Sequence, residues 1–187
     1  MPPVRNLRPG YTVAYPNRDK ASSKTTKSIV ILLLLVSVGL MLIVTIGGWS
    51  KLQGLKLVNF AWCALYIIMA VYIARWNRGL LPLAAALGIL LLILALIAGT
   101  GVSGTSWFDR SHFGFAPADT IFGGKGLTPD TLGTVTLLIA PVQALLIFFC
   151  MQGFAQGWNV EVEVPKDEAK RGDKGQSSSG SPEPAAA

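Results

Sequence analysis

The sequence has little charge, and its longest apolar stretches have none. Charged residues make up only 14% of the 187 residues, whereas hydrophobic residues make up 51%. Four apolar runs, at about 28–49, 57–74, 80–98 and 132–154, hold no Lys, Arg, Asp, Glu or His. About 20 apolar residues span the roughly 30 Å hydrocarbon core of a bilayer. The pattern excludes an ordinary soluble domain and predicts four membrane-spanning helices.

The lack of ionisable groups inside these runs also limits the function. Proton relays, ion-coupled transport and voltage sensing use charged or titratable side chains within the membrane. We therefore do not expect an autonomous pump or an ion-coupled transporter. The two cysteines, Cys63 and Cys150, lie at different predicted depths and form no C-x-x-C motif, and His112 is the only histidine. We expect no disulfide, no metal site, no cofactor and no catalytic residue.

The charges that are present lie between and beyond the runs. Twelve Lys and Arg residues lie in 1–27, 75–79 and 155–187, whereas four lie in 50–56 and 99–131. Cytoplasmic segments of membrane proteins carry an excess of Lys and Arg. Both termini are therefore predicted to be cytoplasmic. Because the sequence holds no N-x-S/T sequon, we expect the plasma (inner) membrane of a bacterium.

The expected fold is an all-α integral membrane protein. It is an antiparallel four-helix transmembrane bundle with a long extracytoplasmic loop, 99–131, between its third and fourth helices. A basic cytoplasmic segment, 1–27, precedes the membrane domain at 28–158, and a cytoplasmic tail, 159–187, follows it. Prolines and a glycine interrupt 1–27, so we expect no long regular element there.

The tail divides into two parts. Valines alternate with Glu161 and Glu163 over 160–164, which predicts a short strand that would not be stable alone. From about residue 165 the tail is charged and then rich in Ser, Gly, Pro and Ala. Such a composition buries too little apolar surface to offset the cost of ordering, so this part is predicted to be disordered.

The fourth run contains a proline and a glutamine, Pro141 and Gln143, near the predicted centre of the bilayer. An amide without partners is costly in hydrocarbon, and Pro141 removes a backbone donor, which predicts a kink. Two positions apart, the two side chains point about 200° away from each other. We expect the Gln143 amide to bond a neighbouring helix. Its candidate partners are Ser37, Thr45 and Tyr66.

Small residues recur every four positions in the same run, a pattern that lets helices approach closely. They are Thr136, Ala140 and Ala144. In the alternative interpretation, Gln143 and Pro141 line a cavity for a quinone-like, lipid or small polar ligand, as in a small-molecule transporter or channel component. We favour the interhelical contact, because Ala84 and Gly88 form a further small-residue stripe in the third run.

The segment 99–131 combines aromatic residues with the only histidine. The aromatic side chains are costly to expose to water, so we expect them on the outer leaflet or against a partner. Asp109 and His112 suggest a further alternative, a membrane enzyme, but they fall short of a zinc ligand set and no H-E-x-x-H, G-x-S-x-G or P-loop motif occurs. The candidate interface residues are Trp107, Phe108, Asp109, Arg110, His112, Phe113, Phe115 and Phe122.

The short connection at 75–79 has Trp76 between Arg75 and Arg78. Tryptophan and arginine are common at the membrane interface, where both the ring and the charge are accommodated. These three residues are candidates to anchor a lipid headgroup, or they hold a tight hairpin together. We favour the hairpin.

These patterns favour a non-enzymatic multi-pass membrane protein, an accessory or scaffolding subunit of a larger membrane complex. The expected partners are the lipid bilayer and other membrane-protein subunits, with a homo-oligomer as a further option. The basic N-terminal segment leads directly into a membrane span, so its charge is explained by orientation and by anionic lipid. We expect no nucleic-acid partner.

Overall fold

The computed structural model describes residues 9–52, 55–100, 107–108, 120–121, 124 and 126–166. Within these ranges the chain is mostly helical, and four helices are long and apolar enough to cross a membrane. They are α2 (Ala21–Gly47), α3 (Leu55–Ala74), α4 (Leu80–Thr100) and α5 (Pro129–Ala155). The prediction of four membrane-spanning helices is confirmed, and the chain is a multi-pass membrane protein.

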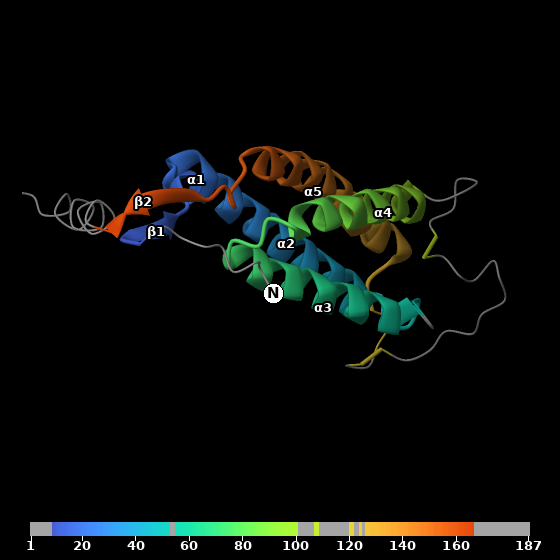
Figure 1. Cartoon of the computed structure of the whole chain (residues 1–187). Helices are drawn as coiled ribbons and strands as arrows, with labels where there is room; N and C mark the ends of the chain where they lie inside the picture. Colours follow the sequence, from blue (N-terminus) through green and yellow to red (C-terminus); the bar gives the residue numbers. More distant parts are fainter. Residues whose placement is uncertain are drawn as a thin grey trace, which may run out of the picture.

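Successive long helices run in opposite directions (Figure 1). Helix α5 packs against both α4 and α2, and α3 packs on α2. Helix α4 touches α3 over a much smaller surface, although the two are consecutive in the sequence. The last helix therefore holds α4 in the bundle, and the α3–α4 contact is the loosest of the four.

Glycine residues allow α4 to approach α5 closely. A Cβ atom added at Gly88 would lie 3.2 Å from Cγ1 of Ile147 and 3.5 Å from Oε1 of Gln143. A Cβ atom added at Gly99 would lie only 2.5 Å from Cγ of Leu137. Small residues at such positions bring two backbones together, and van der Waals packing then stabilises the pair.

Helix α2 begins at Ala21, seven residues before the predicted start of the first span at residue 28. A short helix, α1 (Pro16–Asp19), precedes it, and Lys20 separates the two with an extended backbone. The sequence reasoning expected no long regular element before residue 28. Side chains on the first turns of α2 are buried, Ser23 and Thr26 among them, so tertiary packing extends the helix beyond the apolar run.

Two short strands form an antiparallel ribbon, which corrects the expectation of an all-α fold. Strand β1 (Tyr11–Ala14) pairs with β2 (Val162–Pro165), with Thr12 opposite Val164. The alternating valines predicted β2, but its partner β1 was not predicted. A two-stranded ribbon is marginal alone. Here Arg18 of α1 supports it, because its Nε donates to the carbonyl of Trp158 at 3.1 Å.

The ribbon places the two described chain ends together. Strands β1 and β2 lie beyond one end of the bundle, next to α1 (Figure 1). We call this the ribbon end and the opposite end, where α4 ends and α5 begins, the loop end. Residues 1–8 and 167–187, including most of the predicted disordered tail, lie outside the described residues.

We expect Gly99→Ala to lower the free energy of unfolding by about 1–3 kcal/mol, the usual cost of overpacking. The new methyl group would meet Leu137 and would lie 3.1 Å from the carbonyl oxygen of Gly133. Gly39→Ala on α2 is the matched control, because a Cβ atom there meets nothing within 4 Å. Unfolding of the purified protein in mixed micelles, followed by circular dichroism, measures both; equal effects would contradict the close packing of α4 on α5.

Candidate functional site

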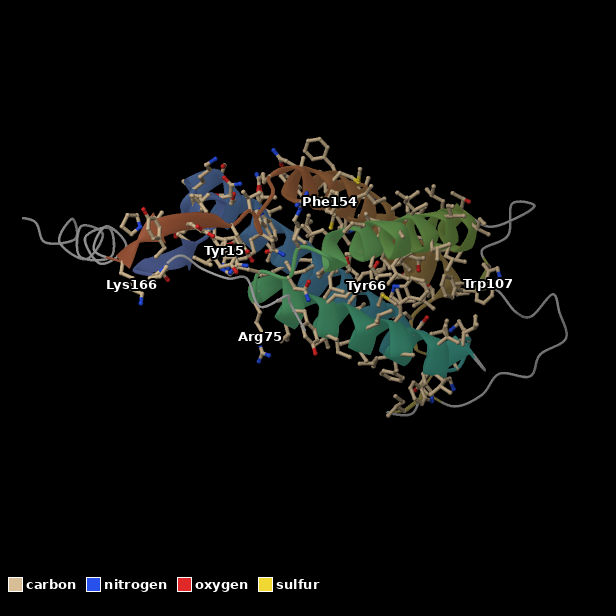
Figure 2. The ribbon with its side chains drawn as sticks, viewed as in Figure 1. Tyr15, Tyr66, Arg75, Trp107, Phe154 and Lys166 are labelled. Atoms are coloured by element: carbon tan, nitrogen blue, oxygen red, sulfur yellow. The ribbon has the colours of Figure 1, made fainter. Side chains whose placement is uncertain are left out.

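Three hydrogen-bonded side chains lie in the middle of the bundle. Gln143 on α5, Ser37 on α2 and Tyr66 on α3 are all fully buried. The Tyr66 hydroxyl donates to Oε1 of Gln143 at 3.0 Å, and Nε2 of Gln143 donates to Oγ of Ser37 at 2.7 Å. Figure 2 shows Tyr66 in the interior of the bundle. We call these three residues the central polar cluster.

The hydroxyl of Ser37 decides how the Gln143 amide is oriented. Ser37 Oγ donates its only proton to the carbonyl of Leu33 at 2.7 Å, so it can only accept from Gln143. The amide nitrogen must therefore face Ser37, which leaves the amide oxygen for the Tyr66 hydroxyl. Since a Cβ atom added at Gly88 of α4 would lie 3.5 Å from this oxygen, the Gln143 side chain bonds two of the other long helices and lies near the third.

Thr45, the third expected partner of Gln143, forms its hydrogen bonds with other residues. Its Oγ1 donates to the carbonyl of Met41 at 2.6 Å and accepts from Nδ2 of Asn59 at 3.1 Å. This bond joins α2 to α3 nearer the loop end. Sequence reasoning did not select Asn59, although a lone amide near the end of an apolar run was the available signal.

Pro141 and Gln143 lie on opposite sides of α5. Gln143 is buried, whereas Pro141 and Ala144 are exposed on the outward face of the bundle. Thr136 and Ala140 are buried. A four-residue step turns a helix by about 400°, so a stripe at this spacing rotates by about 40° at each step. Ala144, the last of the three, has therefore rotated out of the interface that Thr136 and Ala140 share.

Pro141 does not interrupt the helix. The helix α5 continues from Pro129 to Ala155 across Pro141.

The start of α5 has the usual features of a helix N-terminus. The Thr128 side chain accepts a hydrogen bond from the backbone N–H of Thr131 at 3.3 Å, and Pro129 occupies the first turn. Pro141 thus takes part in neither the central polar cluster nor the helix ends.

At the loop end, Trp107 and Phe108 pack on the bundle. Their rings meet edge to face, with centroids 5.6 Å apart. Phe108 is only 3% exposed and lies in a cluster with Val44, Leu52 and Leu132. The Phe108 side chain is therefore buried by residues of its own chain, which makes it a poor candidate for the partner contact that we expected.

The other expected interface residues of this segment lie outside the described residues. They are Asp109, Arg110, His112, Phe113, Phe115 and Phe122. Their roles at an interface, or as the carboxylate and imidazole of an enzyme, stay predictions. Among the residues that the structure describes, no group of three or more His, Cys, Asp or Glu side chains comes together as metal ligands would.

At the ribbon end, Trp76 is a packing residue. It has a φ of +64°, in the left-handed region that few side chains adopt, and so turns the chain sharply after α3. Its ring meets the buried Trp158 ring edge to face at 5.4 Å, and Nζ of Lys27 lies 3.9 Å from its centroid. Trp76 thus joins α2, the α3–α4 connection and the segment after α5.

The two arginines beside Trp76 differ. Nε of Arg78 donates to the carbonyl of Phe154 at 2.8 Å, and its guanidinium carbon lies 4.2 Å from the centroid of the Phe154 ring. Arg78 therefore holds the last turn of α5. Arg75 is exposed and points away from the bundle, as Figure 2 shows, and its contact with a lipid headgroup stays a prediction.

A second polar connection at the ribbon end was not predicted. Nε1 of Trp158 donates to Oε1 of Gln156, and Nε2 of Gln156 donates to Oγ1 of Thr26, both at 2.9 Å. Asn17 of α1 adds a bond from Nδ2 to the carbonyl of Gly157 at 3.1 Å. These bonds tie the turn after α5 to α1 and α2.

The fold and these contacts define a multi-pass membrane protein in which the buried side chains of Gln143, Ser37 and Tyr66 bond to one another across three helices. No protein-family model, curated protein or solved structure matches the chain.

The bond between Gln143 and Tyr66 is open to a double-mutant cycle. We expect a coupling energy of about 0.6–1.7 kcal/mol between Gln143→Leu and Tyr66→Phe, the range known for hydrogen bonds between membrane helices. Gln152→Leu is the matched control, because Gln152 is an exposed glutamine on the same helix. It should lack coupling to Tyr66→Phe. Unfolding in mixed micelles measures the four variants, and a coupling near zero for Gln143 would contradict the cluster.

Because the two arginines are placed differently, we expect their substitution to lower the free energy of unfolding by different amounts. Arg78→Gln should lower the free energy of unfolding by about 1 kcal/mol, because it removes both the hydrogen bond to Phe154 and the contact with its ring. Arg75→Gln, the same change three residues earlier, should stay within about 0.5 kcal/mol, as exposed substitutions usually do. Thermal unfolding in detergent compares them, and an Arg75 effect as large as that of Arg78 would argue against the assignment.

Proposed function

We propose that the protein is a non-enzymatic accessory or scaffolding subunit of a larger membrane complex. The observation that carries the proposal is that both ends of the Gln143 amide bond side chains of the same chain, the nitrogen to Ser37 and the oxygen to Tyr66. A path for a polar solute needs polar groups that can bond the solute in place of water. Here the amide at the middle of the bundle is fully buried and both of its ends are engaged.

The outward face of α5 is the surface best suited to a partner helix. Its exposed side chains include Leu138, Phe148 and Met151, which are 52%, 61% and 58% exposed. Pro141 and Ala144 lie on the same face, and Ala144 leaves a small site between the larger side chains. Transmembrane helices associate through small residues that let large neighbours pack beside them. This face therefore replaces the buried small-residue stripe as the proposed contact.

The transporter alternative has less support. It required Gln143 and Pro141 to line one path, but the two residues lie on opposite sides of α5. The enzyme alternative depends on Asp109 and His112, which lie outside the described residues, and His112→Ala with an unchanged phenotype would dispose of it. We therefore propose an assembly role.

We also propose that the ribbon end faces the cytoplasm of a bacterial plasma membrane. The pairing of β1 with β2 supports a common side for the two chain ends. Positive charge is denser at this end, which is the side that the positive-inside rule assigns to the cytoplasm. Among the described residues, the basic side chains at the ribbon end are Arg18, Lys20, Lys24, Lys27, Arg75, Arg78 and Lys166, against Lys51 and Lys56 at the loop end.

Gentle extraction of a tagged copy should recover a membrane protein in a fixed ratio, identified by mass spectrometry. Ala144→Leu should lower this recovery about tenfold, because overpacking of about 1.4 kcal/mol at the contact corresponds to that factor. Ala86→Leu is the matched control, an exposed alanine on α4. Gln143→Leu should reduce stability but keep the partner. Recovery of no partner, or equal loss in both alanine variants, would contradict the proposal.

A further inference from the structure

A cavity of about 340 Å³ opens at the loop end of the bundle. It is bounded by all four long helices and by the Trp107–Phe108 pair. Its lining on α5 includes Ile139, ten residues after the start of that helix, so the deepest part of the cavity lies about 15 Å from the beginning of α5. A cavity of this size is at the lower end of the range of roughly 300–1,000 Å³ for small-molecule sites.

The mouth of the cavity lies between α3 and α4. The lining residues that are exposed are Leu55 and Val58 on α3 and Leu94 and Ile97 on α4, whereas those from α2 and α5 are buried. The two helices at the mouth touch over the smallest surface in the ring of four. Since both are membrane-spanning, a molecule would enter sideways from the hydrocarbon layer.

The walls are apolar except at a few positions, and none of the lining residues is charged. Asn59 and Thr136 are the lining residues with an amide or a hydroxyl. The Thr136 hydroxyl donates to the carbonyl of Leu132 at 2.7 Å. The Asn59 amide donates to Thr45, but within the described part of the chain its carbonyl oxygen accepts no hydrogen bond. An acceptor in an apolar wall favours a ligand that brings one donor.

We propose that this cavity binds a membrane-soluble alcohol, an apolar molecule whose hydroxyl group donates to the carbonyl oxygen of Asn59. Three observations favour this class. The mouth faces hydrocarbon, the walls exclude charge, and the free acceptor is matched by a hydroxyl donor. A phospholipid acyl chain carries no donor, and a headgroup carries charge that the walls do not meet. The site is separate from the central polar cluster and does not depend on the proposed role in assembly.

Photolabelling of the whole protein in phosphatidylcholine nanodiscs tests the site. The probes are a diazirine-bearing hexadecanol and its methyl ether, which has the same apolar body but no donor. We expect the alcohol to label residues 55–59 and 91–98 saturably and to be displaced by excess hexadecanol. The ether should label these residues about two- to twelvefold less, as expected for the loss of one hydrogen bond of about 0.5–1.5 kcal/mol.

Variants separate the cavity from the general lipid surface. Ala95→Phe fills the cavity and should abolish saturable labelling, whereas Ala86→Phe on the exposed face of the same helix should leave it unchanged. Ala98→Phe at the rim of the cavity serves if Ala95→Phe fails to fold, which circular dichroism would show. Asn59→Leu should make the alcohol and the ether label equally.

Three results would overturn the proposal. Labelling that rises linearly with probe would indicate bulk lipid contact. Labelling of a folded Ala95→Phe or Ala98→Phe protein at the wild-type level would place the probe elsewhere. Equal labelling by alcohol and ether in the wild type would mean that the cavity takes an acyl chain and does not recognise a hydroxyl group.

Discussion

A glutamine amide that is shielded from water, inside helices that cross a lipid layer, has to find its hydrogen-bond partners in the chain itself. Gln143 finds them on two other helices, in Ser37 and Tyr66, and Gly88 lets a third helix lie against its oxygen. Lipid offers no hydrophobic force to drive helices together, so such bonds and close packing determine which faces meet. The inward faces of α2 and α3 supply the partners of this amide on α5.

The ribbon end adds a second level of fixation. Trp158 is fully buried and its ring contacts that of Trp76. The indole N–H of Trp158 donates to Gln156, and the Gln156 amide in turn donates to Thr26 on α2. The segments before α2 and after α5 then pair as β1 and β2. Asn17 and Arg18 add hydrogen bonds to backbone carbonyls 140 residues further along the chain, and these contacts close the bundle at the end where the basic residues gather. Contacts of this kind fix how the four long helices are held at this end, which is compatible with the proposed role in assembly.

The loop end is packed differently. Phe108 covers the ends of the helices together with Leu52 and Leu132, but α3 and α4 remain apart beside it and leave an apolar cavity. The reason lies in the position of α5, which takes the glycine-bearing face of α4 and so draws α4 away from α3. The bundle therefore has hydrogen-bonded polar side chains at its centre, and several hydrogen bonds and a strand pair hold its ribbon end together. At the loop end, an apolar cavity opens between α3 and α4.

The sequence by itself determined the class of fold and one feature of its interior. Runs without ionisable residues determine the four spans, because a charge in hydrocarbon is costly, and an isolated amide such as Gln143 requires a buried partner wherever the helices lie. Only the tertiary structure decided that Ser37 and Tyr66 are the partners while Thr45 bonds Asn59, that Ala144 faces outward, and that β1 pairs with β2. Helical periodicity relates residues a few positions apart, whereas these contacts depend on how distant helices rotate and pack, which is decided by the fit of many small and large side chains at once.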